Sequence, residues 1–224
     1  MEYMLDTVCL ESIEKYLDIV PIKGVTSTPS IIKREGKIDF FSHMKRTLDV
    51  IGGDRTLHMQ VVAKDTVGMM ADAKKIWRIL GEDVFVKIPA SKAGLSALTR
   101  LKKDNAECRI TTSAVYTKLH AFMALEAGAD YVAIYTNRSE ALGIDPFETI
   151  HSAKRYATSQ SLQGKIMASS IKSTTQITDA IEAGADAVTF SPAILEEFFH
   201  FAATKKAIDD FTDDWISLYQ TKMI

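Results

Sequence analysis

The feature that most constrains this chain is a regular alternation of short apolar runs with longer helical segments. Eight runs have the length and composition of strands: residues 3–7, 22–28, 56–63, 83–90, 108–115, 131–138, 165–172 and 187–193. Between them lie segments such as TVGMMADAKKIWRILG (66–81), whose apolar residues recur at helical spacing before a terminal glycine. Because strands that alternate with helices form a parallel sheet, the 224 residues predict an α/β fold, a single-domain (β/α)8 barrel spanning residues 1–224.

Two stretches of the chain resemble each other, as expected of a repeated unit. ALEAGADYVAIYTNR (124–138) and AIEAGADAVTFSPAI (180–194) each read as the end of a helix, a glycine stop and a strand. After the last strand, we predict an extra C-terminal helical segment at about 195–220. This segment carries bulky aromatic residues that need cover, from the barrel, from a neighbouring subunit or from both: Phe198, Phe199, Phe201, Phe211 and Trp215.

Composition and short motifs argue against several classes of function. The formal net charge of −2 gives no reason to expect a nucleic-acid or anionic-membrane partner. We see no signal peptide, membrane span, GxGxxG or P-loop, and the five histidines lack HxH or HExxH spacing. We therefore predict no cofactor and no metal. Cys9 and Cys108 show no CxxC spacing and favour reduced thiols in a cytoplasmic protein.

The stretch DVFVKIPAS (83–91) places a lysine inside an apolar strand. Side chains alternate along a strand, so Lys87 shares one face with Phe85 and Pro89, while aliphatic residues occupy the other. The aliphatic face suits packing against outer helices. Lys87 is therefore expected to point into the barrel near its upper end. A lone strand lysine is often ion-paired or snorkelling, and that alternative stays open here.

The same alternation on other strands predicts further polar side chains inside the barrel. They are Asp6, Thr26, Thr28, His58, Gln60, Thr111, Ser113, Tyr135, Ser170 and Lys172, with Arg138 just past the sixth strand. Barrel sites lie at the C-terminal ends of the strands, and an ordinary core does not need so many polar groups there. We therefore predict a wet functional pocket around Lys87.

A partly desolvated lysine has a specific chemical use. Desolvation favours the neutral amine, which attacks a ketone or aldehyde to form a Schiff base. The reaction needs a proton shuttle, which Asp6, or Tyr135 acting with Gln60 and a bound water, could supply. Each residue also has a plainer interpretation: Asp6 as the cap of the following helix, Tyr135 as core, and Arg138 as a surface ion pair. His58 suits a structural or substrate-contacting role.

Four motifs of this chain resemble those of the small transaldolase-like family that includes fructose-6-phosphate aldolases. They are GVTSTPSI (24–31), VKIPAS followed by GL (86–95), YVAIYTNR (131–138) and ASSIK (168–172). The resemblance runs from residue 5 to the end, and it implies the barrel fold and a class I aldolase or transaldolase mechanism. The pairing of the second-strand motif with the lysine motif is the specific part.

The resemblance also implies roles for individual residues. Lys87 matches the Schiff-base lysine, Asp6 the acidic residue of the first strand and Tyr135 the tyrosine of proton transfer. Gln60 stands where the aldolases carry glutamine and transaldolases carry glutamate. Ser113 stands where a threonine usually helps to hold a catalytic water.

At the substrate end, the resemblance places phosphate near Arg138, Ser170 and Lys172, with Thr26 and Thr28 also in contact with substrate. Thr28 departs from the family, which has an asparagine there that contacts the hydroxyls of the bound ketone. Related short-form enzymes assemble into rings, so the resemblance implies a homo-oligomer, a pentamer or decamer, with the C-terminal helix on a neighbour.

The resulting hypothesis is a metal-free Schiff-base aldolase that cleaves or forms a ketose phosphate. The expected reaction converts fructose 6-phosphate into dihydroxyacetone and glyceraldehyde 3-phosphate. The first alternative is a transaldolase of the pentose phosphate pathway, which moves a dihydroxyacetone unit between sugar phosphates. The second is a non-catalytic sugar-phosphate-binding barrel. A metal-dependent aldolase is disfavoured because no ligand cluster is visible in the sequence.

Overall fold

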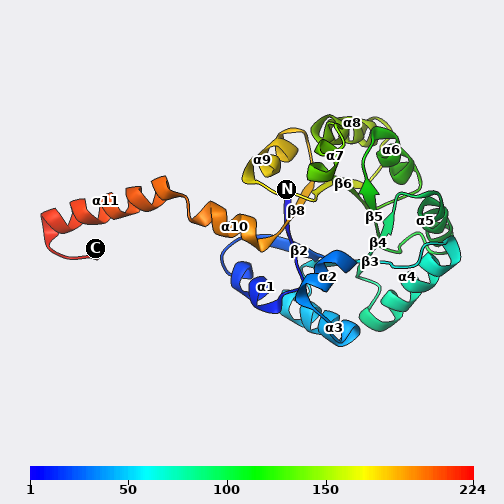
Figure 1. Ribbon diagram of the computed structural model, residues 1–224, viewed down its shortest axis with the longest axis horizontal. Helices are drawn as coiled ribbons and strands as arrows, with labels where there is room; N and C mark the ends of the chain where they lie inside the picture. The colour runs from blue at the N-terminus through cyan, green and yellow to red at the C-terminus, as the bar shows by residue number, and fades with distance from the viewer. The chain divides into compact units, whose positions relative to one another are not determined.

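A computed structural model describes residues 1–224, which form two compact units, Met1–Pro192 and Ala193–Ile224. In the first unit, eight parallel strands close into a barrel in sequence order, so the predicted (β/α)8 fold is confirmed (Figure 1). The strands are β1 (Glu2–Asp6), β2 (Ile22–Thr26), β3 (Thr56–Gln60), β4 (Phe85–Pro89), β5 (Ile110–Val115), β6 (Tyr131–Tyr135), β7 (Lys165–Ser169) and β8 (Ala187–Phe190).

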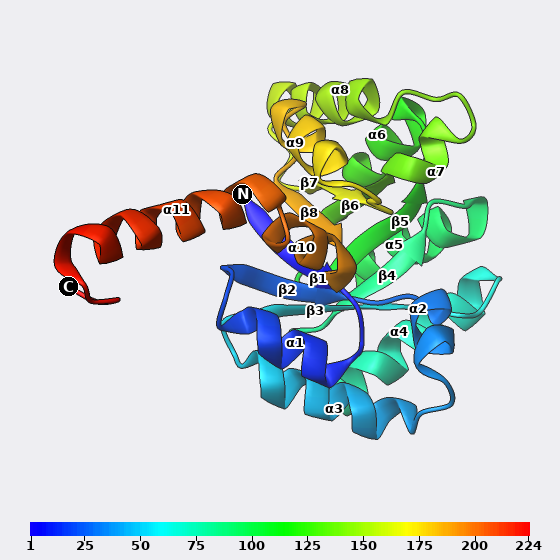
Figure 2. The same cartoon turned by 60° about the vertical axis from the view of Figure 1, so that its left-hand side comes forward.

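Helices of the first unit surround the strands, as Figure 1 and the turned view of Figure 2 both show. They are α1 (Leu10–Leu17), α2 (Pro29–Glu35), α3 (Phe40–Ile51), α4 (Thr66–Leu80), α5 (Lys92–Asp104), α6 (Lys118–Glu126), α7 (Thr136–Glu140), α8 (Pro146–Ser159) and α9 (Thr174–Glu182). Two of the strand–helix repeats carry an extra short helix: α2 precedes α3 after β2, and α7 precedes α8 after β6. Helix α7 begins directly after β6, and α2 begins three residues after the end of β2, so both add residues to the same end of the barrel.

Several strands end earlier than the sequence predicted. β2 stops at Thr26, β3 at Gln60, β6 at Tyr135 and β7 at Ser169, two to three residues before the expected ends. The predicted bounds were wrong there because the residues that follow each strand form loops, helix caps or the first turns of helices. Thr28, for example, is the N-cap of α2, and its hydroxyl oxygen accepts a hydrogen bond from the Ile31 amide.

The barrel interior is filled by side chains below the level of Lys87. A buried cluster unites Met4, Phe85, Tyr131, Ala133, Met167 and Ala187 from five strands. Their alternation along each strand places the aliphatic neighbours, such as Val86 and Ile88, on the outer face beneath the helices. Fully burying one such side chain stabilises the fold by about 1.5–3 kcal/mol. The strand that carries Lys87 is therefore held on both faces.

A glycine sets the distance between β4 and α5. A Cβ atom at Gly94 would lie 1.9 Å from the carbonyl oxygen of Pro89, so only glycine allows this approach. The hydroxyl of Ser91 caps the helix by accepting a 3.0 Å hydrogen bond from the Gly94 amide. These contacts fix α5 against the end of β4, two residues beyond Lys87.

The C-terminal unit is built mainly from helices. The predicted segment at about 195–220 is two helices, α10 (Pro192–Phe199), which begins at the unit boundary, and α11 (Ala202–Tyr219). No residue of α11 is buried. The organisation of residues 1–224 as one domain stays a prediction. None of the helices in the chain combines the length and apolar character needed to cross a bilayer.

Candidate active site

Lys87 lies in the wall of a cavity of about 270 Å³ at the C-terminal ends of the strands. Only 2 % of the residue is exposed, and its register neighbours are Gln60 on β3 and Thr111 on β5. Of the predicted site residues, the cavity is lined by Asp6, Thr28, Lys87, Tyr135, Arg138, Ser170 and Lys172. The structure therefore brings together residues from both ends of the sequence around one lysine.

The electrostatic surroundings of Lys87 favour a reactive amine. Burial lowers the pKa of Lys87 because the charged ammonium loses hydration. The carboxylate of Asp6 acts in the opposite direction and raises the lysine pKa, although less strongly than burial lowers it. The balance increases the fraction of neutral amine at a given pH, which is the form that attacks a carbonyl.

Asp6 ends β1 and is held by one threonine, which a second threonine contacts in turn. The hydroxyl of Thr26 donates a 2.6 Å hydrogen bond to Asp6 Oδ1, and it lies 2.6 Å from the hydroxyl of Thr189 on β8. Helix α1 has Cys9 as its N-cap residue, so the structure does not use Asp6 as the cap. Thr26 is fully buried behind Asp6 and does not line the cavity. Its position suits orienting the carboxylate.

Gln60 and Ser113 lie on the two strands that flank β4. The Ser113 hydroxyl donates a 2.8 Å hydrogen bond to the Gln60 side-chain carbonyl oxygen. Ser113 is fully buried, and Gln60 is partly exposed. Neither lines the cavity of Lys87, but Gln60 also borders a second cavity of about 480 Å³ between α2, α3 and α4. We assign the site to the smaller cavity because it contains Lys87 and Asp6.

Tyr135 closes the cavity from β6. Its ring meets Tyr116 edge to face at 5.4 Å, and the Arg138 guanidinium carbon lies 5.0 Å from the ring centre. Burial raises the pKa of Tyr135, while the charge of Arg138 acts to lower it. The alternative ion pairs of Arg138 are not formed: the Glu140 carboxylate accepts from Gln176, and Asp145 caps α8.

The residues after β7 reach the cavity in a way that alternation did not predict. Ser169, not Ser170, shares the inward face with Met167, and it pairs with Tyr135 in the sheet. The strand ends there, and Ser170 adopts a left-handed backbone with φ of 59°. That turn places Ser170 and Lys172 in the cavity wall. Their predicted place on the inward strand face was therefore wrong, although both line the cavity.

Five polar residues of the cavity wall were missed by the sequence analysis: Ser30, Arg34, Asn137, Ser169 and Ser191. Ser30 and Arg34 are four residues apart in α2, so helical spacing from Ser30, inside the GVTSTPSI motif, could have placed both on one face. Asn137 and Ser191 each follow a strand closely, where barrel sites form. Correct strand ends would have revealed them.

His58 occupies the layer below Lys87 and does not line the cavity. It is fully buried, and its ring stacks on Phe85 at 4.6 Å. Both ring nitrogens have hydroxyl partners, Thr111 and Thr56. The position supports a structural role rather than direct substrate contact. No group of three or more His, Cys, Asp or Glu side chains in the chain is arranged to hold a metal ion.

A family model described as transaldolase/fructose-6-phosphate aldolase matches residues 3–222. The chain belongs to this family. The resemblance inferred from the four motifs is thereby confirmed. In this chain, one cavity is lined by three residues from the matched region: Lys87 of β4, Asp6 of β1 and Tyr135 of β6.

Curated relatives of this family member carry two kinds of name. A "Probable fructose-6-phosphate aldolase" from Streptococcus pneumoniae is 42% identical over 100% of both chains. A "Probable transaldolase" from Coprothermobacter proteolyticus is 30% identical over 96% of both chains. Another from Methanococcus vannielii is 29% identical over 96% of this chain and 97% of its own. The names divide along the same two activities that the sequence left open.

Proposed function

We propose that this protein is a class I aldolase whose Lys87 forms a Schiff base with a ketose phosphate. The observation that carries the proposal is a buried lysine in a cavity wall, with a lowered pKa and the Asp6 carboxylate on the same cavity. The proposed reaction is reversible cleavage of fructose 6-phosphate into dihydroxyacetone and glyceraldehyde 3-phosphate. The 42% identical aldolase-named relative supports this choice.

Schiff-base formation begins with the neutral amine of Lys87. Its lone pair attacks the ketone carbon, and transfer of one proton from the nitrogen to the oxygen gives a neutral carbinolamine. The oxygen then leaves as water after a further proton transfer, and the nitrogen lone pair forms the C=N bond of the iminium. Tyr135 stays protonated near neutral pH because burial raises its pKa, so it is suited to donate the proton to the departing oxygen.

Carbon–carbon cleavage follows from the iminium. Asp6 accepts the proton of the hydroxyl next to the scissile bond, and that hydroxyl carbon becomes the aldehyde of glyceraldehyde 3-phosphate. The electron pair of the broken bond moves into the iminium and leaves an enamine on Lys87. Protonation of the enamine carbon regenerates the iminium, and water hydrolyses it to dihydroxyacetone and free lysine. The hydrogen bond from Thr26 orients Asp6 for the proton transfer.

The phosphate is proposed to bind at the edge of the cavity formed by the ends of β6 and β7. Arg138 and Lys172 bring positive charge there, and Ser170 brings a hydroxyl. A guanidinium binds phosphate through two parallel hydrogen bonds, whereas the lysine acts as a point charge. Thr28 lies in the same cavity on the β2 side and is proposed to contact the ketone portion.

The deciding experiment is reductive trapping of the lysine adduct. The protein is incubated with dihydroxyacetone, reduced with borohydride, and analysed by intact mass and peptide mapping. We expect one adduct, located on Lys87. Lys87→Met should give none, whereas Lys92→Met, an exposed neighbour on α5, should be modified like the parent protein. Absence of a Lys87 adduct with any small ketose would contradict the proposal.

A transaldolase is the second candidate, supported by the relatives that carry that name at 29% and 30% identity. It would use the same Lys87 adduct but pass the three-carbon unit to another aldehyde. Fructose 6-phosphate is therefore supplied with erythrose 4-phosphate. Rapid formation of sedoheptulose 7-phosphate without free dihydroxyacetone would replace the aldolase assignment with transaldolase and place the enzyme in the pentose phosphate pathway.

We further propose a cytoplasmic homo-oligomer, a pentamer or decamer by family resemblance. Cys9 and Cys108 form no disulfide, which suits a reducing compartment. Large apolar side chains of the C-terminal unit are exposed in the single chain, among them Phe201 at 64% and Phe211 at 70%. Another subunit would cover them. Light scattering should give the mass of the ring, and Phe211→Asp should lower it.

A further inference from the structure

A buried polar layer lies directly beneath the lysine. His58 precedes Gln60 by two residues on β3, so its side chain points inward one layer below the level of Lys87. Its ring is stacked between aromatic groups, with Phe85 parallel at 4.6 Å and Tyr131 edge-on at 5.0 Å. The imidazole is therefore fixed in place, and its two nitrogens face defined partners.

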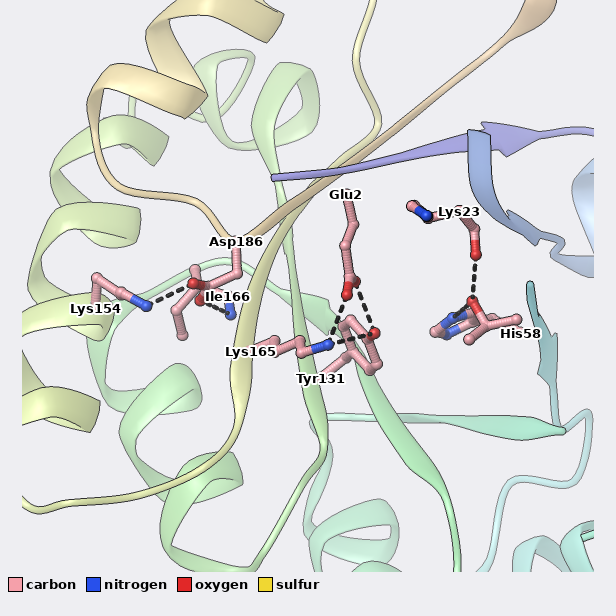
Figure 3. Close-up of polar contacts among 9 residues, drawn as sticks. Glu2, Lys23, His58, Tyr131, Lys154, Lys165, Ile166 and Asp186 are labelled. Carbon is pink, nitrogen blue, oxygen red and sulfur yellow. Dashed lines mark hydrogen bonds and ion pairs between the residues drawn. The ribbon is translucent and has the colours of Figure 1, made fainter. Parts of the chain in front are cut away.

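The partners determine which nitrogen of His58 carries hydrogen. The Thr56 hydroxyl donates to the backbone carbonyl of Lys23 at 3.4 Å, so its oxygen is left to accept from His58 Nε2, 3.0 Å away (Figure 3). A neutral imidazole has one N–H, so Nδ1 is then the acceptor. It receives the hydroxyl hydrogen of Thr111 across 2.8 Å. The chain of hydrogen bonds thus has one direction, from Thr111 down to Lys23.

The charges around His58 keep the imidazole neutral. Burial lowers its pKa well below the ordinary value, and the positive charges of Lys87 and Lys165 add to this. Lys165 is itself paired with Glu2 at 2.6 Å, and Tyr131 also donates to Glu2, as Figure 3 shows. Arg109 lies over Phe85, but its ion pair is with the exposed Asp83. No carboxylate contacts His58 to favour its charged form.

Thr111 lies beside the lysine in the sheet, although no hydrogen bond joins the two side chains in the structure. It is fully buried on β5 and is the register neighbour of Lys87, with both side chains inside the barrel. Since the hydroxyl hydrogen of Thr111 is committed to His58, the remaining lone pairs of its oxygen are free to accept from an N–H once the lysine amine turns toward it. An amine that donates downward to Thr111 directs its own lone pair toward the cavity.

We propose that His58 is a positioning residue for Lys87 and acts through the hydroxyl of Thr111. The inference rests on the proposed Schiff-base function and adds two residues to it. Neither lines the cavity, so neither touches substrate. Their effect is to aim the amine at the ketone carbon and to support the N–H of the protonated amine and of the iminium.

The test separates the orientation of the Lys87 amine from its pKa by measuring the rate of adduct formation as a function of pH. Dihydroxyacetone and cyanoborohydride are used with the full chain, and intact mass gives the trapping rate. The variants are His58→Phe, which keeps the stack on Phe85, and Thr111→Val, which keeps the shape. We expect the plateau rate at high pH to fall about tenfold in each, the loss of one hydrogen bond. The midpoint of the profile should move to lower pH, because the ammonium loses an acceptor.

The titratable groups that face Lys87 must be considered in reading that midpoint. They are Asp6 from β1, His58 from β3 and Tyr135 from β6, with Arg138 and Lys172 on the cavity wall. The substitutions leave all of them except His58 in place. His58 is neutral across the measured range, so a midpoint shift reports the lost acceptor and not the loss of a charge.

Thr112→Val is the matched control. Thr112 is the buried neighbour of Thr111 on the same strand, and its hydroxyl has no hydrogen-bond partner. We expect it to leave both the plateau and the midpoint unchanged. The double variant of His58 and Thr111 should lose no more than either single variant, because both belong to one path. His58→Asn, which retains a side-chain acceptor near Nδ1, should recover part of the plateau.

Two results would overturn the inference. One is an unchanged plateau and midpoint in folded Thr111→Val, with folding judged by the thermal midpoint. The other is a double variant whose losses equal the product of the single losses, since that would mean independent effects. Should His58→Phe fail to fold, Thr111→Val and His58→Asn decide alone. Failure of the parent protein to form any adduct would instead contradict the proposed function, so the two failures are distinguishable.

Discussion

The Ser113 hydroxyl donates to the Gln60 side-chain carbonyl at 2.8 Å and so links β5 to β3 across the strand that carries Lys87. The bond fixes which end of the amide is free, because the carbonyl oxygen is occupied and the NH2 group remains. A catalytic water or a substrate hydroxyl near Gln60 would therefore meet a donor. The orientation of one amide depends on one buried hydroxyl.

Ser113→Ala should release the Gln60 amide to rotate. We expect kcat for fructose 6-phosphate cleavage to fall about tenfold, with little change in KM, because proton handling and not substrate binding is affected. Steady-state kinetics with detection of glyceraldehyde 3-phosphate measures this. Ser113→Thr keeps the hydroxyl and should retain most of the activity. Equal losses in the alanine and threonine variants would mean that packing, not the hydrogen bond, is responsible.

Lys87→Met should abolish activity and stabilise the fold. Burial lowers the pKa of Lys87 in the folded state, whereas the unfolded lysine titrates near about 10.4. Below that pH the unfolded chain binds the proton more readily, so lysine at this site costs stability at neutral pH. Urea denaturation at pH 7 should show a higher free energy of unfolding for Lys87→Met. Lys92→Met, at an exposed site, should lie within about 0.5 kcal/mol of the parent.

Tyr135→Phe should lower kcat about a hundredfold by removing the proposed proton donor. Burial raises the pKa of the Tyr135 hydroxyl, so the phenol is protonated up to at least the ordinary tyrosine value of about 10. Any loss of activity caused by its ionisation should therefore occur above that pH, and the phenylalanine variant should lack it. Tyr116→Phe is the control from the same aromatic pair. A comparable loss in Tyr116→Phe would remove the special role of Tyr135.

His58 should make the protein sensitive to mild acid. Its pKa is lowered in the folded state, and the unfolded residue titrates near about 6.5. As pH falls below that value, the unfolded chain gains a proton that the folded chain does not, so stability is lost. Above it, both states are neutral and no penalty exists. Chemical denaturation at pH 7 and pH 5 should show a smaller drop for His58→Phe than for the parent; equal drops would show that His58 is protonated when folded.

The alternation of strands with helices predicted the barrel, and the alternation of side chains along a strand predicted the direction of Lys87. Both patterns repeat over many residues, so they can be recognised in the sequence. The alternation of side chains failed at the strand ends, where the chain enters loops and helix caps before the expected last residue of the strand. Ser170 is the clearest case, since a left-handed residue after Ser169 breaks the alternation on which its placement relied. Arg34 was missed for a related reason, because the helical segment after the second strand was predicted without bounds, whereas α2 begins at Pro29.

The hydrogen bonds between individual side chains inside the barrel could not be predicted from the sequence. Alternation predicted that Thr26 and Asp6 share the interior, but not that the threonine hydroxyl binds the carboxylate. That choice depends on sheet register, which pairs Asp6 with Thr26 directly. The same register sets His58 beside Phe85 and Lys87 beside Thr111. Register is fixed by the packing of all eight strands, so it could not be read from any single strand.

The sequence motifs implied an asparagine at the position of Thr28, and Thr28→Asn tests what the threonine does there. Thr28 lines the cavity and caps α2 through a long bond of 3.4 Å from the Ile31 amide. Asparagine is at least as good an N-cap, so the fold should be unaffected. Its amide adds a donor and an acceptor for the hydroxyls of a bound ketone, and one added hydrogen bond is worth about 1 kcal/mol. We expect kcat/KM with dihydroxyacetone as donor to rise about fivefold.

Thr28→Val is the control for this prediction. It loses both the cap and the hydroxyl, so it should lower stability by about 1 kcal/mol without any gain in rate. A lower kcat/KM in a folded asparagine variant would indicate that threonine suits a different donor.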